Sequence, residues 1–351
     1  MIVRRSPSAT PSPSGTTARA LAEAMAQPLV DSFGRVHRDL RISVTDRCNF
    51  RCVYCMPEEG MDWTPRDELL TFEEIERIAR VLVDRFSFDS IRLTGGEPTV
   101  RARLPVLVHK LSALGVDLAM TTHGATLGLL ADDLVAAGLN RINISLDSLQ
   151  ADRFLQLTRR DALGQVLDGI DAAVAAGFTP VKVNVVLMRG INDDEIVDFA
   201  TFGRERGVQV RFIEFMPLDA DGAWRAEQVI SRDEIVAAIG AVYPLEAITR
   251  DHHPAELYRY SDGAGEIGII PTVTDAFCGS CDRVRLTAEG GLRNCLFALE
   301  EEDLRGLLRG GGTDDDLAAA VVANIGAKWA GHQINQVQFI RPARSMSQIG
   351  G

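Results

Sequence analysis

Six cysteines are the residues of this sequence with the clearest capacity for chemistry, and they form two groups of three. The groups are Cys48-x3-Cys52-x2-Cys55 and Cys278-x2-Cys281-x13-Cys295. A disulfide framework explains them poorly, because the chain is large and shows no secretory signal. Three thiolates on a short loop can hold three irons of a four-iron cubane and leave the fourth iron open to a small molecule.

Zinc is the alternative metal, because thiolate ligands suit both zinc and iron–sulfur clusters. A structural zinc site needs four ligands, and the loop of the first group has neither a His nor a fourth Cys. At the second group, His252, His253 or His332 could complete a zinc site. The sequence therefore favours two cubanes but leaves zinc open at the second group.

The bulk composition is that of an acidic globular protein. The 351 residues are 46% hydrophobic and carry a formal net charge of -12, which argues against general binding of nucleic acid or anionic membranes. There is no run of about 18 apolar residues, so no transmembrane helix is predicted. Residues 1–30 contain a Ser- and Pro-rich tract, and we predict that they form a disordered N-terminal extension.

Strand-like and helix-like segments alternate from residue 38 onward, which predicts an α/β fold. Six such repeats over residues 31–245 imply a parallel sheet curled into a full or partial barrel, with reactive loops at the carboxyl ends of the strands. The expected strands are residues 40–44, 90–93, 117–120, 141–145, 181–187 and 209–214. The expected helices are residues 72–87, 103–114, 129–137, 163–176 and 193–205.

The pattern changes after about residue 245. Short strand-like segments at 257–260, 267–270 and 284–287 come before helix-like segments near 300–308 and 314–327. We therefore expect residues 246–351 to form a smaller C-terminal subdomain that packs on the barrel.

The first cysteine group, with Tyr54 before its last Cys, resembles the signature of radical S-adenosylmethionine enzymes. The resemblance implies a partial (β/α)6 barrel and a [4Fe–4S] cluster whose open iron chelates the amino and carboxyl groups of S-adenosylmethionine. Electron transfer to this cofactor would release a 5′-deoxyadenosyl radical. The protein would position the cofactor and exclude water.

Several segments together resemble a narrower family, the GTP 3′,8-cyclases of molybdenum cofactor biosynthesis. They are residues 39–56, 93–99, 142–147, 211–217, 277–286 and the final 350–351. This resemblance implies a lyase with two [4Fe–4S] clusters. A hydrogen would be taken from C3′ of the GTP ribose, and C3′ would then bond to C8 of guanine to give 3′,8-cyclo-7,8-dihydro-GTP. The second cluster would bind the guanine end.

The same resemblance implies the biochemical setting. The enzyme would be cytoplasmic and would receive electrons from a donor of the flavodoxin or ferredoxin type. A cyclic pyranopterin monophosphate synthase (MoaC) would consume its product. A homodimer is possible, and neither nucleic acid nor membrane is expected as a partner.

The family's functional residues map onto positions of this chain. Cofactor contacts fall on Tyr54, Gly96, Ser145 and Met216. GTP contacts fall on Arg41, Arg92, Thr121, Lys182, Arg283, Val284 and Arg285. Catalytic roles fall on Arg283, Arg285, Gly350 and Gly351, with the Gly-Gly tail reaching toward the GTP site. One residue departs from the family, since His123 stands where Asn is common; it could cap the same turn or hydrogen-bond similarly.

The positions of the cations in the expected strands support the same GTP site. Four of them lie on expected strands beside apolar neighbours: Arg41, Arg92, Lys182 and Arg211. An unpaired charge is costly there, which favours a polar cavity over a solvated face. Arg283 and Arg285 are two residues apart on an expected strand, so they point to one face. A strand edge protected by charge is the alternative explanation for that pair.

Two other functions would also use two clusters. A two-cluster electron carrier is disfavoured, because ferredoxin-like carriers usually hold each cluster with four Cys. A radical enzyme acting on a peptide is disfavoured by the Gly-Gly tail and by the Arg283–Arg285 pair.

Overall fold

The computed structural model describes residues 27–219, 222–248, 254–334, 336 and 339–350. Most of the expected disordered extension, together with His252, His253 and Gly351, lies outside these residues. Residues 29–30 are an exception to that expectation. They form strand β1 (Leu29–Val30), which pairs antiparallel with β2 (Val36–His37) in a short hairpin.

The central feature is a twelve-stranded sheet in the order β14-β13-β12-β3-β4-β5-β6-β7-β8-β11-β10-β9. Its middle six strands are all parallel and follow the order of the sequence. They are β3 (Asp39–Ser43), β4 (Ser90–Thr94), β5 (Asp117–Thr122), β6 (Arg141–Ser145), β7 (Val181–Leu187) and β8 (Gln209–Glu214). The predicted six-repeat partial barrel is therefore confirmed.

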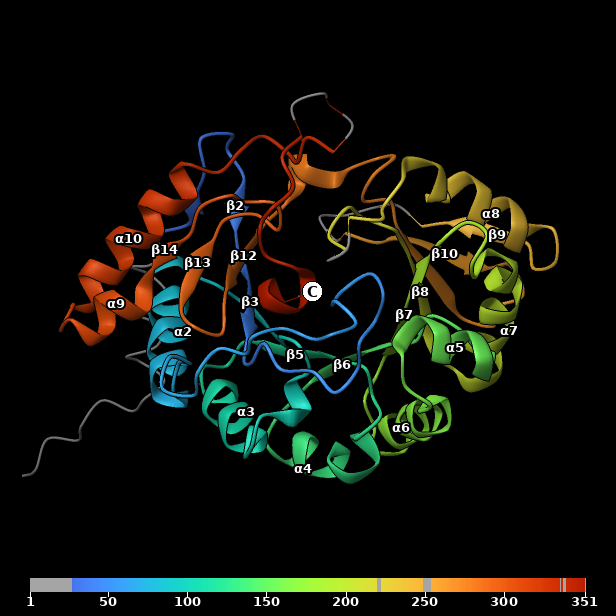
Figure 1. The fold of residues 1–351 in the computed structure, drawn as a ribbon, viewed down its shortest axis with the longest axis horizontal. Coiled ribbons are helices and arrows are strands. Elements are labelled where there is room, and N and C mark those ends of the chain that lie inside the picture. Colours follow the sequence, from blue (N-terminus) through green and yellow to red (C-terminus); the bar gives the residue numbers. More distant parts are fainter. Residues whose placement is uncertain (1–26, 220–221, 249–253, 335, 337–338, 351) are drawn as a thin grey trace, which may run out of the picture.

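Helices cover the convex side of the curved sheet (Figure 1). They are α2 (Phe72–Phe86), α3 (Leu104–Ser112), α4 (Ala131–Ala136), α5 (Ala151–Thr158), α6 (Leu163–Ala175) and α7 (Ile196–Arg206). Short 3-10 turns are η1 (Pro98–Val100), η2 (Leu127–Leu129), η3 (Asp193–Glu195), η4 (Ala226–Gln228) and η5 (Phe277–Ser280). The helix α5 was not predicted. Its apolar face, with Phe154 and Leu157 buried, spans only about two turns, which is too short for a clear helical period.

The C-terminal part of the chain extends the sheet at both edges. On one side β11 (Glu266–Ile270) pairs parallel with β8, followed by β10 (Glu256–Tyr260) and β9 (Leu245–Ala247). On the other side β12 (Arg283–Leu286) pairs parallel with β3, followed by β13 (Gly291–Arg293) and β14 (Glu302–Asp303). The remaining helices are α8 (Arg232–Gly240), α9 (Leu304–Arg309) and α10 (Asp314–Gly326).

The expected C-terminal subdomain thus joins the barrel through the sheet itself. The first and last strands of a parallel barrel sheet expose unpaired backbone groups, and strands from the C-terminal part satisfy them. Local periodicity identified these strands but carried no information about their partners.

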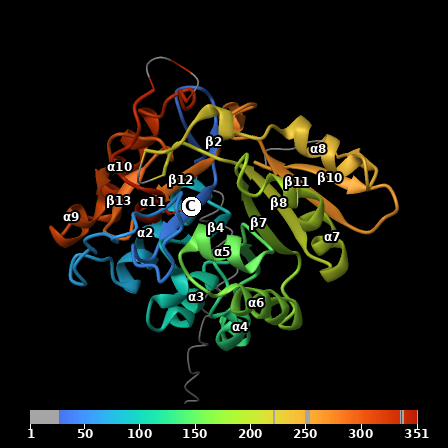
Figure 2. The same ribbon diagram turned by 45° about the vertical axis from the view of Figure 1, so that its right-hand side comes forward.

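The chain then returns to the middle of the molecule. Helix α11 (Met346–Ile349) lies inside the curve of the sheet, and the described C-terminus is central in both views (Figures 1 and 2). A buried apolar core, which includes Leu40, Ile91 and Val183, fills the space between the strands and the outer helices. The concave side is thereby left for polar side chains.

Candidate active site inside the curved sheet

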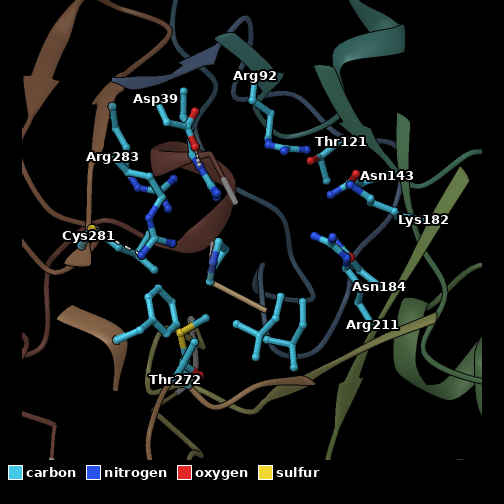
Figure 3. A pocket seen from close by; sticks show the side chains of 18 of the residues that line it. Asp39, Arg92, Thr121, Asn143, Lys182, Asn184, Arg211, Thr272, Cys281 and Arg283 are labelled. Atoms are coloured by element: carbon cyan, nitrogen blue, oxygen red, sulfur yellow. Dashed lines mark hydrogen bonds and ion pairs between the residues drawn. The ribbon is translucent and has the colours of Figure 1, made fainter. Parts of the chain in front are cut away.

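A cavity of about 700 Å³ lies on the concave side of the sheet. Most of the predicted site residues line it: Arg41, Tyr54, Arg92, Thr121, Ser145, Lys182, Met216, Cys278, Cys281, Arg283, Arg285 and Cys295. Figure 3 shows Arg92, Thr121 and Lys182 on one side, with Arg283 and Cys281 opposite them. The structure thus brings together residues that are as much as 254 positions apart, from Arg41 to Cys295.

The cavity runs along the strands rather than only over their carboxyl ends. Ser145 ends β6 and Met216 follows β8, so both lie at the carboxyl end. The cations lie deeper, with Lys182 the second residue of β7 and Arg211 the third of β8. The expectation that the reactive groups sit at the carboxyl ends therefore holds for the candidate cofactor residues but not for the cations.

Three arginines form a row across neighbouring strands. Arg285 pairs in register with Arg41, and Arg41 with Arg92. Burial and the charge of Arg41 lower the pKa of Arg92 to about 9. Asp39 lies 3.7 Å from Arg41 Nε, yet the Nε atoms of both Arg41 and Arg92 are buried without a hydrogen-bond partner. Buried donors of this kind are costly unless a ligand accepts from them.

A second group of cations stands on β6 to β8. Burial and the charges of Arg211, Arg141 and Arg92 lower the pKa of Lys182 to about 7. Burial, together with Arg141 and Arg41, lowers the pKa of Arg211 to about 10. Mutual repulsion among buried cations is relieved when a polyanion enters, so this wall suits a phosphate chain.

The three thiols of the first group lie on the loop after β3 and are all free. Burial, with the Glu97 carboxylate, raises the pKa of Cys48 to about 11. Burial, with Cys48, raises that of Cys55 to about 12. Burial and Cys55 also raise the pKa of Cys52. Thiols that are this difficult to ionise become thiolates only when metal ions bind them.

Each cysteine group supplies three free thiols, the donor set of a cubane with one open iron. Within the described residues, no three His, Cys, Asp or Glu side chains are grouped closely enough to hold one metal ion. A zinc ion would need its sulfurs about 2.3 Å from one point. A cubane instead places each thiolate on a different iron, so both cysteine groups fit a [4Fe–4S] cluster.

The second cysteine group has a more electropositive setting. Cys278 lies on η5, Cys281 just after it, and Cys295 after β13. Burial alone would raise the pKa of Cys281, but the charges of Arg283 and Lys328 lower it to about 6. His332 Nε2 lies 2.7 Å from the carbonyl oxygen of Thr272, to which it donates. This bond occupies the only zinc-completing histidine within the described residues.

Arg283 and Arg285 share one face of β12, as predicted. Arg283 lies over the ring of Phe277, 4.7 Å from its centroid, and its Nη2 donates to Cys281 Sγ at 3.3 Å. Arg285 is buried and donates to the carbonyl oxygen of Gly350. Val284 points the other way, into the core, with none of its surface exposed. Its side chain therefore cannot contact a ligand in the cavity, because alternate strand residues face opposite sides.

Gly350, the residue before the last, is tightly enclosed. A Cβ added to Gly350 would clash with the hydroxyl of Thr94, and its φ of +81° favours glycine as well. In the same helix α11, Ser347 lies close enough to Cys55 to favour its thiolate and so partly offset the raised pKa of that thiol. The tail thus touches the first cysteine group and Arg285 together, while Gly351 lies outside the described residues.

Of the candidate cofactor residues, Tyr54, Ser145 and Met216 line the cavity. Tyr54 donates to Asp147 Oδ2 at 2.6 Å, and Asp147 also accepts from the main-chain N–H of Val186. Gly96 is not on the cavity wall. A Cβ there would clash with the main-chain carbonyls of Asp46 and Arg47, so its lack of a side chain lets this loop approach the first cysteine group.

His123 serves the turn in the way expected of an Asn replacement. Its Nδ1 accepts from the main-chain N–H of Ala125 at 3.1 Å, so its Nε2–H donates to Asn49 Oδ1 at 2.7 Å. The ring also stacks on Phe50, with centroids 3.9 Å apart. His123 therefore supports the loop immediately beside Cys48.

Sequence reasoning missed several polar residues of the wall. Asn143 and Asn184 line the cavity next to Lys182 and Ser145. Each is two residues from a predicted site residue in the same strand, with an apolar residue between them. The two-residue period of strands could have identified both. Asp147, two residues beyond Ser145, is a third example.

Comparisons with known proteins agree with this site. A family profile described as the radical SAM superfamily matches residues 42–203, and one described as Molybdenum Cofactor Synthesis C matches residues 208–334. The crystal structure of Streptococcus suis SuiB bound to S-adenosylmethionine has a TM-score of 0.58 over 92% of this chain and 79% of that one. At 13% identity this likeness shows the fold alone.

Curated relatives narrow the assignment. The GTP 3′,8-cyclase of Mycobacterium sp. (strain KMS) is 48% identical over 328 residues, which are 92% of this chain and 94% of the relative. The GTP 3′,8-cyclase of Rhodopirellula baltica is 47% identical over 92% of both chains. The fold and the first cysteine group define a radical S-adenosylmethionine protein. Within that superfamily, the chain belongs to the GTP 3′,8-cyclase family, whose cofactors are two [4Fe–4S] clusters and S-adenosylmethionine.

Proposed function

We propose that this protein converts GTP to 3′,8-cyclo-7,8-dihydro-GTP, the first step of molybdenum cofactor biosynthesis. The observation that carries the proposal is a cavity of about 700 Å³ lined by buried cations, by all three Cys of the second group and by Tyr54, the residue before the last Cys of the first group. Its polar wall suits a nucleoside triphosphate, and the two cysteine groups suit a reaction that joins two parts of one bound molecule.

The cations would bind the triphosphate. Arg41, Arg92 and Lys182 converge on the deep part of the cavity, where Arg41 and Arg92 have buried Nε atoms with no acceptor. Arg211 stands next to them and would add a fourth charge. Thr121, on β5, would donate to the same ligand. Phosphate oxygens would relieve both the repulsion and the missing hydrogen bonds.

The ribose and base would then span the distance between the two cysteine groups. When bound, the first cluster and S-adenosylmethionine supply the radical that takes a hydrogen from C3′. Tyr54, Ser145 and Met216 would orient the cofactor, with Asp147 fixing the hydroxyl of Tyr54. The guanine would face the second cysteine group, where Arg283 lies within reach of both base and sulfur. This placement would bring C8 toward C3′.

The tail would complete the site. Gly350 lies between Ser43, Thr94 and Arg285, and Gly351 would extend from there. The terminal carboxylate would hold the arginines of β12 in place for the substrate. Because α11 also contacts Cys55, the tail would exclude water from the first cluster as well.

We also propose that the two parts of the chain supply different groups to the site. Residues 31–245 would supply the radical-generating site, and residues 246–351 would supply the second cluster, the β12 arginines and the tail. The support for it is that β12 carries Arg283 and Arg285 to the edge of the sheet beside Arg41.

The partners are inferred from the same chemistry. An electron donor of the flavodoxin or ferredoxin type would reduce the first cluster, and cyclic pyranopterin monophosphate synthase (MoaC) would take up the product. No helix in the described part of the chain is long and apolar enough to cross a membrane. We place the enzyme in the cytoplasm, because six free thiols that hold clusters need a reducing compartment. A homodimer is compatible with this function.

One incubation tests the proposal. Anaerobically reconstituted protein is mixed with S-adenosylmethionine, dithionite and GTP, and the products are identified by mass spectrometry. We expect 5′-deoxyadenosine together with the cyclic nucleotide. The Cys48, Cys52 and Cys55 triple Ala variant should give neither, whereas Arg80→Ala, an exposed change on α2, should give both. Production of 5′-deoxyadenosine without any GTP product in the wild-type protein would contradict the assignment.

A further inference from the structure

A buried lysine outside the predicted site lies directly beside the second cysteine group. Lys328 follows α10 and is only 4% exposed. Its Nζ lies 3.0 Å from the carbonyl oxygen of Arg283 and 3.7 Å from Cys281 Sγ. It also lies 3.4 Å from the carbonyl oxygen of Cys281. All of these groups accept hydrogen bonds, so the ammonium group is held against a cysteine that would bind the cluster.

The N-terminal hairpin holds Lys328 in this position. His37 Nδ1 lies 3.4 Å from Lys328 Nζ, and His37 Nε2 lies 3.1 Å from Asp31 Oδ2. An ammonium group can only donate, so Nδ1 accepts from Lys328 and the Nε2–H donates to Asp31. Asp31 and His37 are themselves buried. The result is a chain of hydrogen bonds in which Lys328 donates to Cys281 and to His37, and His37 donates to Asp31.

Arg35, from the turn of the same hairpin, fastens the surrounding loops. Its Nη1 donates to the carbonyl oxygens of Cys278 and Ala330, each at 2.8 Å, and its Nη2 donates to that of Trp329 at 2.6 Å. Its Nε donates to Asp31 at 2.5 Å. One guanidinium therefore ties the hairpin to the cysteine loop and to the segment that carries Lys328. Such bidentate arrangements fix geometry closely.

Charge near a cluster affects its reduction. A [4Fe–4S] cluster gains an electron on reduction, and its potential depends on net charge, hydrogen bonds to sulfur and burial. Lys328 supplies a positive charge and a donor to sulfur within a buried setting. Around the first cysteine group the charges are mixed: Cys52 is influenced by the carboxylate of Asp147, and Cys48 by that of Glu97 and by the guanidinium groups of Arg51 and Arg160. Cys281, by contrast, has two cations, Arg283 and Lys328, directly against its sulfur.

We propose that Lys328, held by the Asp31–His37 pair, is a positioning residue of the second cluster that donates to Cys281 and makes the cluster's reduction potential less negative. The hairpin of residues 29–37 is then part of the second cluster's outer shell. This inference rests on the presence of the second cluster in the proposed function but not on GTP being the substrate.

The test measures the reduction potential of the second cluster in full-length protein. The triple Ala variant of the first cysteine group leaves only the second cluster, so its signal can be followed alone by electron paramagnetic resonance during a redox titration. Three substitutions are compared in this background: Lys328→Arg keeps the charge, Lys328→Gln keeps a donor without charge, and Lys328→Met removes both. Lys110→Met serves as the matched control, because Lys110 is a partly exposed lysine on α3 paired with Glu76.

The expected result is a lower potential wherever the charge is lost. Lys328→Gln and Lys328→Met should change the equilibrium constant for reduction by about tenfold, which is 59 mV for a one-electron couple. Lys328→Arg and Lys110→Met should stay at the parent value. An unchanged potential in Lys328→Gln and Lys328→Met would overturn the proposal.

The iron content of the variants distinguishes a failure of this proposal from a failure of the proposed function. About four irons per chain in the triple variant confirm the second cluster itself. If all three Lys328 variants lose that iron while remaining folded, Lys328 is needed for assembly and the tuning role is overturned. If the triple variant itself binds no iron, the second cluster of the proposed function fails, whatever Lys328 does.

Discussion

We expect GTP binding to depend on pH through Lys182, the lysine proposed to bind the triphosphate. It stands on β7 with 7% of its surface exposed, and burial together with Arg211, Arg141 and Arg92 lowers its pKa from 10.5 to about 7. The free protein therefore holds this lysine about half protonated at pH 7 and about one-tenth protonated at pH 8. A bound triphosphate would restore the charge.

Binding should thus take up a proton, and the uptake should grow with pH. The expected uptake is about 0.5 proton at pH 7 and about 0.9 proton at pH 8. The affinity for GTP should fall by up to about tenfold for each pH step of one above 7, equivalent to about 1.4 kcal/mol. The affinity falls with rising pH because the pKa of Lys182 is lowered, so the charged form that binds phosphate is lost above pH 7.

Calorimetry measures this uptake directly. GTP is titrated into anaerobic holoenzyme without reductant, in buffers of different ionisation enthalpy, between pH 7.5 and pH 8.5, where free GTP changes little in charge. Lys182→Arg is the matched control, because the higher intrinsic pKa of a guanidinium keeps it largely charged over this range. The difference between wild type and Lys182→Arg isolates the lysine. Equal proton uptake in the two proteins would refute the reasoning.

The same shift predicts an effect on stability. The folded pKa lies below the unfolded one, so the unfolded chain binds more protons and stability rises with pH between about 7 and 10.5. The penalty is complete below pH 7 and corresponds to about 5 kcal/mol. Lys182→Met should therefore stabilise the protein against urea at pH 6 and have little effect near pH 10. A stabilisation that does not change with pH would contradict the assigned cause.

Three further outcomes test other parts of the site. Arg283→Ala and Arg285→Ala should each lower the rate of cyclisation by about a hundredfold, as expected for loss of a charged donor, while iron content stays at about eight per chain. A loss of thermal stability with unchanged turnover would instead indicate structural arginines. Deletion of Gly350 and Gly351 should abolish cyclisation with both clusters retained, and an added peptide ending in Gln-Ile-Gly-Gly should restore some turnover. Full activity of the truncated protein would show that the tail plays no part. His123→Asn should lower the free energy of unfolding by about 1–3 kcal/mol through loss of the Phe50 stack and the Asn49 bond, measured by urea denaturation, with cluster content unchanged. Equal stability of the two proteins would mean that the stack contributes nothing.

The sequence alone determined the chemistry of this protein, because that chemistry depends on spacing within short segments. Three Cys within eight residues must share a loop, whatever the rest of the chain does. Alternating strand and helix patterns specified the six parallel strands, since period is a local property. Charged residues such as Arg92 and Lys182, placed inside apolar strands, already indicated a polar cavity.

Tertiary structure decided which of these groups meet. The pairing of β12 with β3 places Arg285 beside Arg41 and brings the second cysteine group to the cavity. The sequence pattern predicted β12 but not its partner, because an unpaired strand edge accepts any strand whose backbone groups match it. For the same reason the role of Lys328 could not be predicted, because nothing in the sequence around it distinguishes this lysine from others. Only the folded chain places its ammonium group within 3.7 Å of Cys281 Sγ, because contacts between segments 47 residues apart depend on packing rather than on local period.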